Sequence, residues 1–141
     1  MKVILASAYD INPYKGSESG TGWNFILQIS RFNKVVAVTR KNNSHNINKY
    51  IKENNIDKSN LSFLYYDLPY FLRFWKRGER FSFLYYNLWQ MFLPLFIVIK
   101  RVKFDFTNHI NFHADHVPSY LWLLGKPFIW GPINHNEPIL K

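Results

Sequence analysis

Five short apolar runs, separated by segments with helix or loop character, constrain the fold of this 141-residue chain more than any other feature. They occupy residues 3–6, 35–38, 61–66, 104–110 and 127–130. Continuous apolar runs of this length are typical of strands that are covered on both faces of a sheet. Their alternation with helical segments predicts an α/β fold, a Rossmann-like parallel β-sheet with helices on both faces.

The most apolar runs belong in the centre of such a sheet. Numbered along the chain, the five strands are expected in the order 3-2-1-4-5, with the run at residues 3–6 in the middle. Ligands of parallel sheets bind beyond the carboxyl ends of the strands. The candidate ligand loops are therefore residues 8–22, 108–116 and 131–137.

Helical segments fill the intervals between the strands. They are predicted at residues 23–32, 43–54, 81–103 and 117–124. The first of them begins within a glycine-rich stretch, Pro94 is expected to kink the third, and Gly125 ends the fourth.

Composition excludes several classes of function. The absence of cysteine rules out disulfides, thiolate metal sites and cysteine catalysis. The 18 Lys and Arg exceed the 9 Asp and Glu, a net charge of +9, which favours anionic partners or reflects solubility alone. The start, MKVILASAYD, has too short an apolar run for a signal peptide.

A glycine-rich segment follows the first predicted strand: KGSESGTGW, residues 15–23. Its glycines would let the backbone approach a ligand and aim amide groups at a phosphate or a sugar hydroxyl. It is neither a Walker loop nor a dinucleotide fingerprint. The alternative is a helix entry whose glycines serve only close packing. Glu18 is either a hydroxyl acceptor or a carboxylate at the start of a helix.

His109 lies at the carboxyl end of the fourth predicted strand. A substrate hydrogen-bonding role explains this position best, and a solvated loop histidine is the alternative. A metal site with His113, Asp115 and His116 is disfavoured, because the spacing is not that of a metal motif.

Seven basic residues and one acidic residue flank the aromatic block at residues 81–103. A membrane-docking surface is predicted from Arg73, Lys76, Arg77, Trp89, Lys100 and Arg101. Some rings of this block are expected to be exposed. The alternative is a buried core helix with charged ends. Nucleic acid is not an expected partner, because no binding motif for it is present.

Two segments of the chain resemble a subgroup of the family-4 glycosyltransferases. They are KGSESGTGW at residues 15–23 and PSYLWLLGKPFIWGP at residues 118–132, with Glu137-Pro138 following in register. The resemblance implies the N-terminal half of a GT-B fold, in which two Rossmann-like domains face each other across a cleft. Residues 1–141 are then a single, incomplete acceptor-side domain.

The donor-binding C-terminal domain of this family carries a pair of glutamates at a fixed spacing. None of Glu18, Glu53, Glu79 and Glu137 has that spacing. The resemblance therefore implies that the donor domain is absent and that this chain alone is inactive.

The resemblance also implies site residues. His109 aligns with a family histidine that hydrogen-bonds the transferred sugar, and it is the expected catalytic residue. The expected substrate-binding residues are Gly16, Ser17, Glu18, Gly20, Gly22, Gly131, Pro132 and Asn134. Asn134-His135 stand where family members usually have a glycine pair, which leaves less room for close backbone approach.

The expected function follows from the resemblance. It is transfer of a sugar, with retention, from a nucleotide-sugar donor to a saccharide or lipid-linked acceptor in surface polysaccharide biosynthesis. No cofactor or metal is expected, and the expected location is cytoplasmic, peripheral on the inner face of the membrane. The alternative is an inactive binding or membrane-docking module that kept the fold.

Overall fold

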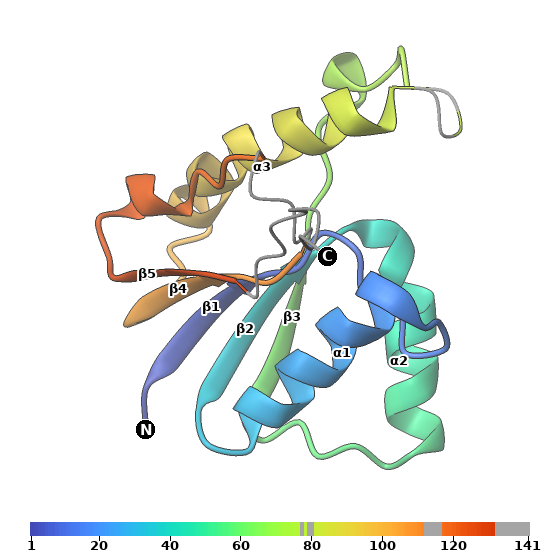
Figure 1. Ribbon diagram of the computed structural model, residues 1–141, viewed down its shortest axis with the longest axis vertical. Helices are drawn as coiled ribbons and strands as arrows, with labels where there is room; N and C mark the ends of the chain where they lie inside the picture. Colours follow the sequence, from blue (N-terminus) through green and yellow to red (C-terminus); the bar gives the residue numbers. More distant parts are fainter. Residues whose placement is uncertain (77, 79–80, 112–116, 132–141) are drawn as a thin grey trace, which may run out of the picture.

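The five strands form one parallel sheet in the order β3-β2-β1-β4-β5, in a computed structural model that describes residues 1–76, 78, 81–111 and 117–131 (Figure 1). The strands are β1 (Val3–Ser7), β2 (Lys34–Thr39), β3 (Leu61–Tyr65), β4 (Phe106–His109) and β5 (Phe128–Trp130). The α/β class, the strand order and the central position of β1 are confirmed.

Helices cover both faces of the sheet. They are α1 (Ser17–Ser30), α2 (Ser44–Glu53) and α3 (Ser82–Ile99), with 3₁₀ turns η1 (Lys41–Asn43), η2 (Tyr70–Leu72) and η3 (Leu121–Leu124). As Figure 1 shows, α1 and α2 lie on one face and α3 lies on the other. Parallel strands need such crossover connections, because a tight hairpin cannot join them.

Each face of the sheet carries its own apolar core. Along β2, Val35 and Ala37 pack in the cluster that contains Trp23 of α1. Val38 packs in the opposite cluster, with Trp89 of α3. Successive side chains of a strand point to opposite faces, so one continuous apolar run supplies both cores.

Two helix predictions differ from the structure. Helix α1 begins at Ser17, so more of the glycine-rich stretch is helical than expected. Within residues 117–124, only Leu121–Leu124 form a helix, a 3₁₀ turn. Pro118 disfavours helical geometry at Val117, so a helix cannot begin at residue 117. Gly125, with a φ of +64°, follows the turn as expected.

Helix α3 runs without interruption through Pro94, which is buried within it. By length and composition this helix could cross a membrane, with a mean hydropathy of 1.4 and 39% of its residues buried. The core helix of a soluble protein meets the same criteria. Trp89, fully buried between α3 and the sheet, places one face of this helix in the core.

Candidate functional site

The loop after β1 folds back on the first turn of α1, at the carboxyl edge of the sheet. The Ser19 hydroxyl donates to the Asp10 carboxylate over 2.6 Å, and the Asn12 amide donates to the Ser19 carbonyl over 3.2 Å. These contacts set the position of the helix start. The amide groups of a helix start carry partial positive charge, so this end of α1 favours an anionic group.

Close packing accounts for two glycines of this segment. A Cβ on Gly20 would overlap the carbonyl oxygen of Lys15, and a Cβ on Gly22 would lie 2.8 Å from Nδ2 of Asn111. Gly16 is exposed, and a Cβ there would meet nothing within 4 Å. Close approach of a ligand to the backbone stays a prediction, and Gly16 is the glycine most open to it.

The neighbours of Gly16 also lie near the surface. Ser17 is exposed and has a φ of +55°, a strained value for a residue with a side chain. Glu18 is half-buried, and its carbonyl accepts a hydrogen bond from Asn111. The substrate-binding role of both residues stays a prediction.

His109 is the last residue of β4 and is only 3% exposed. Its Nε2 lies 3.3 Å from the Tyr86 hydroxyl, which donates to the Asn111 carbonyl over 3.2 Å. With its proton given to Asn111, the hydroxyl accepts from Nε2, and Nδ1 is then the acceptor nitrogen of the ring. His109 is therefore a buried, oriented histidine, and the solvated-loop alternative is wrong.

Asn111 connects His109 to the helix start. Its Nδ2 donates to the Glu18 carbonyl over 3.2 Å, and its side chain faces Gly22. Its Oδ1 is buried and has no hydrogen-bond partner among the described residues. Buried acceptors normally have a donor, so this oxygen is available to a donor from outside the described residues.

Gly131 joins the same site from β5. Its amide donates to the His109 carbonyl over 3.1 Å, and its carbonyl accepts from the Asn108 side chain over 3.2 Å. The structure thus brings Gly131, His109 and the start of α1 together, through Asn111 and Tyr86. Pro132 and Asn134 lie outside the described residues, as do His113, Asp115 and His116 of the metal alternative.

Neither Asn111 nor Tyr86 is among the residues predicted from the sequence. Asn111 had a signal, because it lies in the loop after β4 that the strand pattern already indicates as a ligand loop. Nothing in the sequence pattern pointed to Tyr86, because only the packing of α3 on the sheet brings its hydroxyl to His109.

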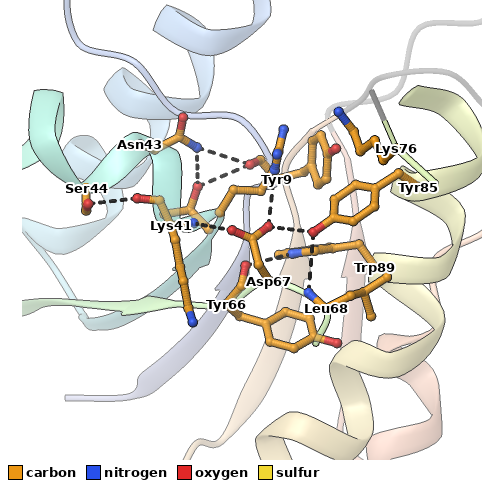
Figure 2. Close-up of polar contacts among 12 residues, drawn as sticks. Tyr9, Lys41, Asn43, Ser44, Tyr66, Asp67, Leu68, Lys76, Tyr85 and Trp89 are labelled. Carbon is orange, nitrogen blue, oxygen red and sulfur yellow. Dashed lines mark hydrogen bonds and ion pairs between the residues drawn. The ribbon is translucent and has the colours of Figure 1, made fainter. Parts of the chain in front are cut away.

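A second polar cluster lies at the carboxyl ends of β2 and β3, and it also was not predicted (Figure 2). Asp67 accepts hydrogen bonds from Arg40 Nε over 3.3 Å, from the Lys41 amide over 3.1 Å and from the Tyr85 hydroxyl over 2.7 Å. The Arg40 guanidinium lies over the rings of Tyr9 and Tyr85, at 5.1 and 5.2 Å. A signal was present, since Arg40 and Asp67 each follow a predicted strand almost directly.

Both tyrosines of this cluster stay protonated at neutral pH. Burial raises the pKa of Tyr9 to about 12. Burial and the hydrogen bond to Asp67 raise the pKa of Tyr85 as well. The Tyr85 hydroxyl therefore remains a donor to Asp67, and neither ring adds negative charge beside Arg40.

The proposed membrane-docking residues do not share one environment. Trp89 is 0% exposed, and its Nε1 donates to the Tyr66 carbonyl, so its inclusion in a docking surface is wrong. Arg73, Lys100 and Arg101 are exposed, and Lys76 is half-buried. Arg77 lies outside the described residues.

The exposed apolar face of α3 consists of other residues. Leu84, Met91, Leu95 and Val98 are exposed. Their spacing places them on one stripe of the helix. Among the rings of the aromatic block, Phe81 is exposed as expected, whereas Tyr85 is buried.

No family model, curated protein or solved structure matches this chain. Its fold and the contacts at the carboxyl edge of the sheet are therefore the observations from which a function is inferred. Within residues 1–76, 78, 81–111 and 117–131, no group of three histidine, aspartate or glutamate side chains could hold a metal ion.

Proposed function

We propose that this chain is the acceptor-side domain of a retaining glycosyltransferase, which moves a sugar from a nucleotide-sugar to a saccharide or lipid-linked acceptor. The observation that carries the proposal is the meeting of two distant segments. Two segments, residues 15–23 and 118–132, resemble one glycosyltransferase subgroup, and Glu18 of the first and Gly131 of the second each hydrogen-bond to a residue within 109–111. Gly131 binds the His109 carbonyl, and Asn111 binds the start of α1.

The chemistry of the site suits a sugar beside a phosphate. Asn111 Oδ1 is a buried acceptor that a sugar hydroxyl could satisfy. His109, two residues before Asn111 in the chain, is held in place by the Tyr86 hydroxyl. The start of α1 offers amide groups and a positive dipole to a departing diphosphate. Preorganised dipoles of this kind stabilise the charge that develops in group transfer.

Replacement of His109 by glutamine tests the catalytic role. The assay follows sugar transfer by the polypeptide of the whole reading frame, including whatever is encoded after Lys141. We expect a fall of about 100-fold in turnover, because a positioned hydrogen-bonding group near the reacting centre contributes about that much. Glutamine keeps an amide near the Tyr86 hydroxyl, so the melting temperature should change little.

His45→Ala is the matched control, because His45 is an exposed residue of α2. It should leave transfer unchanged. Unchanged transfer by His109→Gln, with a folded protein, would refute the catalytic role. Absence of transfer by the wild-type polypeptide with all common nucleotide-sugars would refute the proposed activity itself.

A membrane-docking module is the second candidate, and the outer face of α3 favours it. The apolar stripe formed by Leu84, Met91, Leu95 and Val98 runs toward exposed basic residues at the end of the helix. These are Lys100, Arg101 and Lys103. An apolar stripe beside clustered cations fits an anionic bilayer surface, where each cation contributes on the order of 1 kcal/mol. This docking would place the protein on the inner face of the membrane as a peripheral protein.

Leu95→Glu tests the docking face. It removes apolar area from the middle of the stripe and adds a charge that anionic lipid repels. We expect about a tenfold loss of affinity for phosphatidylglycerol vesicles in co-sedimentation, since a buried leucine contributes about 1.5–3 kcal/mol. Phe32→Glu, at an exposed apolar residue after α1, should bind like the wild type. Equal binding of wild type to neutral and anionic vesicles would contradict the proposal.

A further inference from the structure

A cavity of about 490 Å³ opens beside the Asp67 cluster. Six of the described residues line it: Arg40, Tyr70, Arg73, Phe74, Lys76 and Tyr85. They come from the end of β2, from the segment around η2 and from α3. Cavities that hold small ligands have volumes of roughly 300–1,000 Å³, so this one has room for a small organic ion.

The lining of the cavity is strongly positive. Three of the lining residues are cationic, and none of them is acidic. The nearby carboxylate, Asp67, is already bonded to Arg40, and its side chain is 5% exposed against 21% for that of Arg40. Among the described residues, three positive charges against one buried negative charge leave an excess of two toward the cavity.

Two of the cations are held in place before any ligand arrives. Arg40 is fixed by Asp67 and lies over two tyrosine rings. Lys76 Nζ donates to the Gly78 carbonyl over 2.8 Å and lies 5.4 Å from the centre of the Tyr85 ring. Figure 2 shows Lys76 beside Tyr85, next to the Asp67 cluster. Groups that are already ordered lose less entropy when they bind a ligand.

We propose that this cavity binds a phosphoryl anion, as a phosphate or diphosphate group of a larger molecule. A dianion matches the excess of two charges, whereas a single carboxylate leaves one unbalanced. Guanidinium groups recognise phosphate oxygens through paired hydrogen bonds, and a lysine adds a point charge. Tyr70 and Phe74 supply apolar surface for the body of the molecule that carries the phosphate.

The anion site does not depend on sugar transfer. It lies at the ends of β2 and β3, whereas His109 ends β4. A failure of the anion site would therefore leave the proposed glycosyltransferase role standing, and the reverse also holds.

Calorimetric titration of the full chain with inorganic pyrophosphate at low salt tests the site. The double variant R73Q/K76Q should weaken binding at least about tenfold, because it removes two charge-assisted partners. The control R31Q/K58Q removes one arginine and one lysine from exposed positions before β2 and β3, so its net charge equals that of R73Q/K76Q. Its affinity should change less than about twofold, since distant exposed charges are screened.

No binding by the wild type, or an equal loss in both double variants, would overturn the proposal. Arg73 is exposed, so R73Q alone serves as the test variant if R73Q/K76Q does not fold. A second arm identifies the source of the phosphoryl group. If pyrophosphate displaces phosphatidic acid vesicles, whose phosphomonoester can carry two charges, from the wild type, the ligand is a lipid headgroup; if vesicle binding is unaffected by pyrophosphate, the ligand is a soluble phosphate. Both results support the site.

Discussion

Asp67→Ala should lower the free energy of unfolding by about 3–5 kcal/mol. The carboxylate accepts hydrogen bonds from Arg40, the Lys41 amide and Tyr85. Its loss leaves a largely buried guanidinium without its counter-charge, and this uncompensated charge is the main cost. Urea denaturation at neutral pH measures the change.

Glu53→Ala is the control for Asp67→Ala. Glu53 also pairs with a cation, Lys49, but both side chains are about half exposed, at 50% and 55%. Exposed pairs contribute about 0–1 kcal/mol, so the control should change stability by less than about 1 kcal/mol. Equal effects of the two substitutions would show that the Asp67 cluster does not stabilise the carboxyl edge of the sheet.

Gly20→Ala should lower the free energy of unfolding by about 3 kcal/mol. In an open helix, alanine would stabilise by about 1 kcal/mol relative to glycine. Here the added methyl group would overlap the Lys15 carbonyl oxygen, a backbone atom that cannot rotate away. The overlap must shift either α1 or the loop before it, and this reverses the sign of the substitution.

Gly16→Ala distinguishes this clash from a general effect of removing glycine. Gly16 has a φ of −83°, and a Cβ there would meet nothing within 4 Å. Gly16 is the residue before the first turn, so its replacement by alanine should lower the free energy of unfolding by no more than about 1 kcal/mol. Thermal and urea unfolding of the two variants should therefore differ clearly. A Gly20→Ala protein as stable as the wild type would contradict the packing role of Gly20.

The strand pattern was predictable because it rests on local sequence. Each apolar run is short and bounded by turn or helix residues, and the side chains of such a run alternate between the two cores. The handedness of parallel crossovers then restricts the topology to few choices. Both the strand order and the central position of β1 could be deduced from these rules without coordinates.

The helix boundaries were less predictable. Glycines normally argue against a helix, so the extension of α1 back to Ser17 could not be read from composition. Glycine is required at positions 20 and 22 because Lys15 and Asn111 approach the helix closely there. Both approaches depend on the chain folding back after β1.

By itself the sequence determined the class of fold, the order of the sheet, and the placing of His109 and Gly131 at its carboxyl edge. Only the tertiary structure decided what surrounds them. Tyr86 reaches His109 and Tyr85 reaches Asp67 because α3 packs across the sheet. The packing of α3 on the sheet also buries Trp89 in the core and leaves the apolar stripe of α3 exposed. Local pattern sets which residues form a strand or helix, whereas the face that is buried depends on the partner element, which lies far away in the sequence.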